Sequence, residues 1–396
     1  MKSEWINKEN KYYMQTVRRQ PIVLVKGEGT RAWDDFGKEY LDFVAGWAVN
    51  SIGHSHPVIV SAATEQSKTL LQTSNQFYTI PQVELAQILI ENSVLDRVFF
   101  ANSGAEANEG AVKLARKFGK VRKKGAYEII TALNSFHGRT LSMVAATGQP
   151  QYQGSFTPMT DGFKYVPFGD FNEIKSSTSD KTVAVLIEPV QGEGGVNIPY
   201  KEYLKDIRAW CDKNGLLLIL DEVQTGLGRL GTLWGYESFD VIPDVITLGK
   251  GLGGGAPIGA FLARQDVAVL EPGDHGSTFG GNALTCAISR NVVRYIIENN
   301  LIDNVQIMSN LLMSKLEQLK SSNNSIKEVR GMGLLIAVEF ESEISSEIIT
   351  RCNENGLLLN AVRPNAVRFM PPLTVNREEI IQAVELFESS LMSNGE

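Results

Sequence analysis

The stretch VAVLIEPVQGEGGVNIPYKEYLKDIRAWCDKNGLLLIL, residues 183–220, contains the pattern that decides the fold. It begins and ends with apolar runs of strand length, which are typical of strands buried on both faces of a sheet. Between these runs Leu204, Ile207 and Cys211 recur at helical spacing, and Gly215 is a favourable residue for the end of that helix. A strand, a helix and another strand in this order predict two parallel strands of a sheet covered by helices.

The same alternation extends from about residue 50 to 290. Further strands are expected at residues 98–101, 128–132, 245–248 and 258–263. We therefore predict an α/β fold whose large domain, residues 51–290, contains a mostly parallel sheet. Residues 1–50, which begin with a polar helix predicted over 8–17, and residues 291–396 are expected to form together a smaller α+β domain.

Composition excludes several classes of protein. The 396 residues include 38 Lys and Arg against 45 Asp and Glu, and the net charge of −7 disfavours a nucleic-acid partner. Three cysteines far apart in sequence predict neither a disulfide framework nor a zinc site, which favours a cytoplasmic protein. No uncharged apolar run approaches the length of about 18 residues that a membrane span needs.

Polar, glycine-rich segments follow the predicted strands at six places. Ligands of α/β sheets bind at the carboxyl ends of strands, so these segments form the candidate site. They cover residues 102–108, 135–140, 188–195, 221–226, 249–255 and 276–282.

The first segment, residues 102–108, is suited to bind a phosphate. Ser103 and Gly104 begin a predicted helix, whose free backbone N–H groups and dipole attract an anion. In isolation, an N-cap is the better explanation of Ser103. The segment matches neither common nucleotide-binding glycine motif, which disfavours a mononucleotide loop.

Two other segments carry reactive groups. Lys250 follows a buried strand in a glycine-rich loop, where a desolvated amine is nucleophilic; a solvated surface lysine is an equal alternative. Asp221 and Glu222 end another buried strand and need partners. Either these carboxylates act as a cap or as metal ligands, or one of them pairs with a nitrogen in the ring of a ligand and keeps it protonated.

The segment 135–140 adds an aromatic ring and a cation. Phe136 offers a stacking face, although core packing is the better explanation of this residue in isolation. Arg139 offers a fork for a carboxylate, although a surface ion pair is the simpler interpretation of one arginine. Taken together, the lysine, carboxylate, aromatic ring, phosphate cradle and arginine fit a pocket for pyridoxal phosphate.

These motifs carry a specific resemblance. DEVQTG at 221–226, with Lys250 following Asp221 after a buried strand, resembles the signature of the class III pyridoxal-phosphate-dependent aminotransferases. NSGAEAN, FHGRT, EPVQGEGG, GKGLGGG and STFGGN, in this order, are similar to the motifs of the acetylornithine aminotransferases among them. The likeness extends from about Pro21 to the end of the chain and implies fold type I of the pyridoxal-phosphate enzymes.

The resemblance also implies roles for single residues. Lys250 would be the catalytic lysine that binds the cofactor aldehyde and moves a proton, and Asp221 the catalytic carboxylate on the ring nitrogen. The cofactor-binding residues would be Ser103, Gly104, Ala105, Phe136, Asp221, Val223, Gln224, Lys250 and, from the neighbouring subunit of a homodimer, Thr278. The substrate-binding residues would be Arg139, Glu193, Ser277 and Arg368. No metal is expected.

The resemblance implies two substrates, an amino donor and 2-oxoglutarate. Arg139 would bind the far carboxylate of both, and Arg368 the carboxylate beside the reacting carbon of glutamate and 2-oxoglutarate. We hypothesise that Glu193 pairs with Arg368 in the donor half-reaction and swings away in the other half.

The identity of the donor depends on fewer residues. Ornithine aminotransferases carry a Tyr at the positions of Gly46 and Arg31, and a Gly leaves room for an acylated nitrogen, which favours N-acetylornithine. Trp47 is larger than the aliphatic residue expected there. Ornithine, succinyldiaminopimelate and 4-aminobutyrate remain alternative donors, and a non-catalytic binding protein is a rival that the intact Lys250 and Asp221 disfavour.

Overall fold

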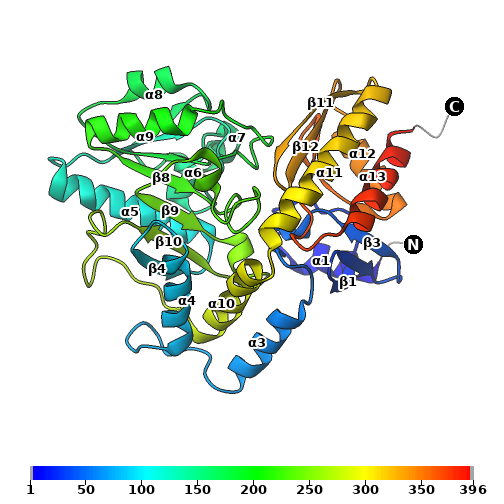
Figure 1. The fold of residues 1–396 in the computed structure, drawn as a ribbon, viewed down its shortest axis with the longest axis horizontal. Coiled ribbons are helices and arrows are strands. Elements are labelled where there is room, and N and C mark those ends of the chain that lie inside the picture. The colour runs from blue at the N-terminus through cyan, green and yellow to red at the C-terminus, as the bar shows by residue number, and fades with distance from the viewer. Residues whose placement is uncertain (1–2, 393–396) are drawn as a thin grey trace.

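The computed structural model describes residues 3–392 and shows two lobes (Figure 1). One lobe contains the largest sheet with helices α4 to α9, and the other contains β1, β3, β11 and β12 with helices α11 to α13. The helices are α1 Glu4–Tyr12, α2 Ala45–Ala48, α3 Pro57–Ser67, α4 Ile80–Glu91, α5 Gly104–Arg122, α6 Leu141–Ala146, α7 Pro150–Gln153, α8 Phe171–Ser177, α9 Tyr203–Asn214, α10 Ala283–Glu298, α11 Leu301–Ser322, α12 Ser345–Asn355 and α13 Arg377–Leu391, with short 3₁₀ turns at Gly154–Phe156, Gly235–Phe239 and Lys250–Leu252.

The largest sheet has seven strands in the order β4-β10-β9-β8-β7-β5-β6. They are β4 Arg97–Ala101, β5 Glu128–Ala132, β6 Phe163–Val166, β7 Thr182–Ile187, β8 Leu217–Asp221, β9 Val245–Leu248 and β10 Gly259–Ala263. Neighbouring strands from β9 to β6 are parallel, whereas β10 runs antiparallel to both β9 and β4. The predicted mostly parallel α/β sheet is therefore confirmed.

The central strands are apolar throughout because both of their faces are covered. In β8, Leu217 and Ile219 belong to one hydrophobic cluster, whereas Leu218 and Leu220 belong to the other. Alternate side chains of a strand point to opposite faces, so each face of the sheet has its own core. The helix after β7 ends at Gly215, whose φ of 60° is the left-handed conformation that ends helices without a steric penalty.

The smaller α+β part is built from both ends of the chain, as predicted. Its first sheet has the order β1-β2-β3-β13, and the two-residue strand β13 pairs in parallel with β3. Its second sheet has the order β11-β12-β15-β14. These strands are β1 Leu24–Glu28, β2 Arg31–Asp34, β3 Glu39–Asp42, β11 Ile326–Met332, β12 Leu335–Phe340, β13 Leu357–Leu358, β14 Asn360–Arg363 and β15 Ala366–Phe369. The boundaries at residues 50 and 290 stay a prediction.

The helix predicted over residues 8–17 was misplaced. The structure has α1 at Glu4–Tyr12, because Ser3 caps it by accepting a hydrogen bond from the Trp5 backbone N–H. Tyr13 is already extended. The predicted start missed this cap.

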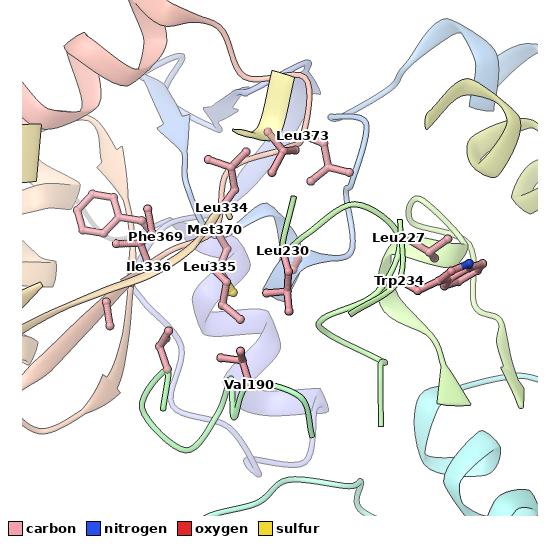
Figure 2. Packing of buried hydrophobic residues seen from close by; sticks show 14 of the residues in the cluster. Val190, Leu227, Leu230, Trp234, Leu334, Leu335, Ile336, Phe369, Met370 and Leu373 are labelled. Atoms are coloured by element: carbon pink, nitrogen blue, oxygen red, sulfur yellow. The ribbon is translucent and has the colours of Figure 1, made fainter. Parts of the chain in front are cut away.

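A cluster of buried apolar side chains joins the two lobes. Figure 2 shows Leu227, Leu230 and Trp234, from the segment after β8, on one side of it. Residues of the smaller part lie on the other side: Leu334, Leu335, Ile336, Phe369, Met370 and Leu373. Arg229 adds two hydrogen bonds across this junction, to the carbonyl oxygens of Leu334 and Pro371, at 3.0 and 2.7 Å. The strand that carries Arg368 is thereby fixed against the large sheet.

Among residues 3–392, no helix is both long and apolar enough to cross a membrane.

Candidate active site

A pocket of about 260 Å³ opens where the predicted segments meet at the carboxyl edge of the large sheet. Strand β4 runs in the same direction as β9, because β10 is antiparallel to both, so its tip reaches this edge too. The lining residues are Gly104, Ala105, Asn108, Phe136, His137, Gly138, Arg139, Glu188, Glu193, Asp221, Val223, Gln224 and Lys250. Five of the six segments thus contribute to one site.

Lys250 lies at the centre of this pocket, directly after β9. Its φ is 42°, a left-handed conformation that costs a non-glycine residue roughly 1–3 kcal/mol and is typical of functional positions. Burial lowers the pKa of the Lys250 amine, while the nearby Glu193 partly opposes this shift. The solvated-surface alternative for Lys250 is therefore wrong.

Asp221 ends β8 and is held by three donors. Its Oδ1 accepts from the Val223 backbone N–H at 3.0 Å. Its Oδ2 accepts from Asn108 Nδ2 and from His137 Nδ1, both at 2.8 Å. The side chain is buried, and its carboxylate is fixed in one orientation at the floor of the pocket.

Asn108 and His137 were missed as functional residues by the sequence analysis. Asn108 lies on the buried face of α5, where Thr247 Oγ1 donates to its Oδ1 at 2.6 Å. A polar residue among Ala107 and Ala111 on an inward helix face was the signal available in the sequence. His137 had no comparable signal, because its partner lies 84 residues away.

Glu222, the neighbour of Asp221, points away from the pocket lining. Its carboxyl group accepts from the backbone N–H groups of Gly235 and Tyr236, at 2.6 and 2.8 Å. Burial raises the pKa of Glu222 to about 8. Of the two acids, Glu222 therefore fixes a loop and only Asp221 serves the site. No three His, Cys, Asp or Glu side chains of the described residues gather as a metal site requires.

The amino end of α5 forms the opposite wall. Ser103 Oγ accepts from the Glu106 N–H at 3.2 Å, so Ser103 is the N-cap, while Gly104 and Ala105 line the pocket. A Cβ added to Gly104 would lie 2.6 Å from a Val223 methyl carbon, which explains the glycine. The 19-residue helix presents its positive end here.

Aromatic side chains and Arg139 form the outer wall. The Arg139 guanidinium lies 3.8 Å from the centre of the Tyr152 ring and 5.4 Å from that of Phe136. Glu188 lies beneath them and accepts from the Phe136 backbone N–H at 3.2 Å. Burial, and then the charge of Asp221, hold the pKa of Glu188 well above its usual range.

Arg368 and Glu193 form an ion pair, which we call the gate pair. Arg368 is fully buried on β15, and its Nη2 lies 2.8 Å from Glu193 Oε1. Gln224 bridges the pair: its Oε1 accepts from Arg368 Nη1, and its Nε2 donates to Glu193 Oε1, both at 3.2 Å. Burial alone would raise the pKa of Glu193, but the charges of Arg368 and Lys250 lower it to about 2. The Glu193 carboxyl group is therefore ionised at neutral pH.

Ser277 and Thr278 lie outside the lysine pocket of their own chain. They line a separate hollow of about 350 Å³ with Asn102 and Glu106. Asn102 Nδ2 donates to Ser277 Oγ at 3.1 Å. Their predicted roles in the site stay predictions.

The site fits the cofactor that the sequence suggested. The pocket joins a buried amine, a fixed carboxylate, an aromatic side chain and a helix amino end, which match an aldehyde, a protonated ring nitrogen, a flat ring and a phosphate. His137 Nδ1 lies 2.8 Å from Asp221 Oδ2 and helps to hold the carboxylate that would pair with the ring nitrogen. The fold and the site define a pyridoxal-phosphate-dependent transaminase of fold type I.

The comparison with known proteins agrees. The family described as "Aminotransferase class-III" matches residues 12–391, and the chain belongs to this family. An acetylornithine aminotransferase of Caldanaerobacter subterraneus is 50% identical over 387 residues, which cover 98% of each chain. Another, of Methanocaldococcus jannaschii, is 49% identical and covers 95% of each chain.

Solved structures show the same fold. An ornithine aminotransferase from Toxoplasma gondii has a TM-score of 0.95 at 36% identity, over 98% of this chain and 94% of that one. An acetylornithine aminotransferase from Elizabethkingia anophelis has a TM-score of 0.87 at 36% identity, over 98% and 97%.

Proposed function

We propose that the protein transfers the δ-amino group of N2-acetylornithine to 2-oxoglutarate. The products are N-acetylglutamate 5-semialdehyde and glutamate, and the reaction belongs to arginine biosynthesis. The observation that carries this proposal is the gate pair in the lysine pocket, because an arginine neutralised by a neighbouring carboxylate suits an enzyme with two differently shaped substrates. The choice of donor is supported by the full-length relatives named acetylornithine aminotransferase.

Bound pyridoxal phosphate supplies an aldehyde for the amino group and a ring that withdraws electrons from the reacting carbon. The amine of Lys250, whose pKa burial lowers, takes and returns the proton of that carbon. The Asp221 carboxylate would keep a proton on the ring nitrogen, and Asn108 and His137 hold this carboxylate in place. Glu188 positions the backbone of Phe136 against the ring face.

The two substrates differ at Arg368. N-acetylornithine presents a CH2–NH2 group to this part of the pocket and has no carboxylate there to pair with Arg368. Glu193 therefore neutralises the guanidinium of Arg368 while this substrate is bound. 2-Oxoglutarate brings a carboxylate next to its reacting carbon, and this carboxylate takes the place of Glu193. Arg139, at the outer wall, binds the far carboxylate of either substrate.

Replacement of Glu193 by Gln is expected to slow the donor half-reaction roughly 10- to 100-fold, because it leaves the buried charge of Arg368 without its counter-ion. The glutamate half-reaction, which brings its own carboxylate, is expected to change much less. Single-turnover rates of the two halves, measured separately, test this. The exposed Glu202→Gln is the control, and an equal loss in both halves contradicts the gate.

A panel of amino donors with 2-oxoglutarate tests the choice of substrate. We expect the highest kcat/KM with N-acetylornithine, above those with ornithine, succinyldiaminopimelate and 4-aminobutyrate. Gly46 lies in a left-handed turn, and Ser51 of the same segment donates to the Gly251 carbonyl, in the loop of Lys250, at 3.0 Å. Gly46→Tyr is therefore expected to lower kcat/KM for N-acetylornithine at least about tenfold, relative to ornithine, by crowding the acyl group.

The matched control is Gly46→Ala, which carries the same strain at a φ of 62° but no ring. If Gly46→Tyr keeps an unchanged kcat/KM for N-acetylornithine, Gly46 is not the residue that leaves space for the acyl group. A panel led by ornithine favours the second candidate function, which the fold of the Toxoplasma enzyme supports.

We also propose a homodimer in which each chain completes the other's site. Large apolar side chains are exposed close to Ser277 and Thr278: Phe77, Tyr78, Ile80 and Phe279. Asn75 Nδ2 donates to the Ser277 carbonyl at 2.9 Å, so segment 75–80 and the loop of Thr278 form one surface. An apolar surface of this kind is typical of a subunit interface. The location in the cytoplasm stays a prediction.

A further inference from the structure

We propose that Gln224 is a latch that holds the gate pair closed and thereby sets the affinity for dicarboxylates. This inference depends on the proposed function, since a gate matters only where one site takes both an ω-amino donor and a dicarboxylate. The resemblance gave Gln224 a different task, a hydrogen bond to the ring hydroxyl of the cofactor.

The contacts of Gln224 form a closed triangle with the gate pair. Arg368 Nη1 donates to the amide oxygen, and the amide nitrogen donates to Glu193, the same carboxylate that Arg368 Nη2 contacts at 2.8 Å. When Glu193 leaves, its hydrogen bond from Gln224 must break together with the ion pair. Hydrogen bonds to charged groups are the stronger ones, so the amide adds to the resistance of the gate.

The side-chain amide of Gln224 lies where it does because residue 192 is a glycine. A Cβ added to Gly192 would lie 1.5 Å from Gln224 Oε1 and 2.6 Å from its Cδ. The carboxamide therefore packs directly on the bare Cα of the residue before Glu193. Gly192 does not have a left-handed φ, so this contact explains the glycine better than backbone conformation does.

The amide can latch the gate and still serve the cofactor. It has two N–H hydrogens, and Glu193 takes one of them. The second would donate to the ring hydroxyl that the resemblance implies. Gln224 is thus a positioning residue that couples the cofactor side of the pocket to the substrate gate.

Gly192→Ala tests the latch without a new charge. The added methyl group collides with the end of a flexible side chain, so Gln224 is displaced while the loop keeps its conformation. In the holoenzyme, the Kd values of glutarate and pentanoate are measured by titration of the cofactor absorbance. Glutarate must open the gate, whereas pentanoate, with one carboxylate for Arg139, does not.

The ratio of the Kd of glutarate to that of pentanoate is expected to fall about tenfold in Gly192→Ala, with pentanoate unchanged. Gln224→Met is expected to lower the same ratio, and it replaces Gly192→Ala as the test if that variant does not fold. In steady state, the KM of Gly192→Ala for 2-oxoglutarate is expected to fall.

Gly154→Ala is the control, because Gly154 is exposed, has a φ of −53° and has no atom within 4 Å of an added Cβ. If the ratio of the two Kd values stays constant in both Gly192→Ala and Gln224→Met, the proposed latch is wrong. A ratio that rises also overturns it, since the amide then holds the carboxylate of the ligand rather than Glu193. Neither result affects the donor panel, so a failure of the latch and a failure of the proposed function are separate outcomes.

Discussion

Replacement of Lys250 by Ala is expected to lower kcat with every amino donor by at least about 10⁴-fold, because the variant loses both the amine that binds the cofactor aldehyde and the base that moves the proton. The buried position of Lys250 in the pocket and its lowered pKa suit both tasks. The measurements are kcat with N-acetylornithine and the amount of cofactor fixed to the protein by borohydride.

The exposed Lys120 provides the matched control, since Lys120→Ala removes a lysine from the end of α5 without touching the pocket. Circular dichroism checks that Lys250→Ala is folded. Residual turnover close to that of the natural protein, or borohydride label on a residue other than Lys250, contradicts the assignment of the catalytic amine.

Replacement of Asp221 by Asn is expected to lower kcat about 10³-fold, since a fixed charge placed to stabilise the charge that develops in the reaction is among the largest single contributions to catalysis. Asparagine keeps the size of the side chain, but it cannot hold a proton on the ring nitrogen. Its amide also cannot accept from all three donors, because an oxygen that faces Asn108 and His137 leaves the NH2 group facing the Val223 backbone N–H. Steady-state kcat and the pH dependence of the cofactor absorbance are the measurements.

Asp180→Asn, at an exposed position, is the control for loss of an acidic charge. If Asp221→Asn kept nearly full activity, the ring nitrogen would need no anionic partner, and the mechanism would have to be revised. A variant at Asn108, which leaves the charge of Asp221 in place, is expected to show a smaller loss.

The sequence predicted the large sheet because the relevant signals are local. The apolar runs of β7 and β8 and the stop at Gly215 lie within 40 consecutive residues, and each reports directly on burial or backbone conformation. The direction of β10 was not available in this way. A run of apolar residues is equally compatible with a parallel or an antiparallel neighbour, and only the pairing of Ala260 with Leu248 and Phe100 settles it.

The site could be predicted to the level of its segments but not of its hydrogen bonds. Topology alone brings the ends of β5, β7, β8 and β9 to one edge, so Phe136, Glu193, Asp221 and Lys250 were expected to meet. The contacts that orient them join residues far apart in sequence, such as Asn108 with Asp221. Gly192 shows the same limit, since a glycine in a polar loop gives no sign that a distant amide packs on it.

The place of β10 between β4 and β9 has a consequence for protein synthesis. Within residues 3–392, β10 is the sole strand that pairs with β4, and the Gly259 Cα packs so closely on the Ser103 carbonyl that an added Cβ would lie 2.0 Å from its oxygen. In sequence order, β4 and the turn at Ser103 therefore acquire their partner only when residues 259–263 have been synthesised, and Arg368 follows more than 100 residues later. The order of synthesis thus places the strand that holds the turn at Ser103 before the strand that carries Arg368.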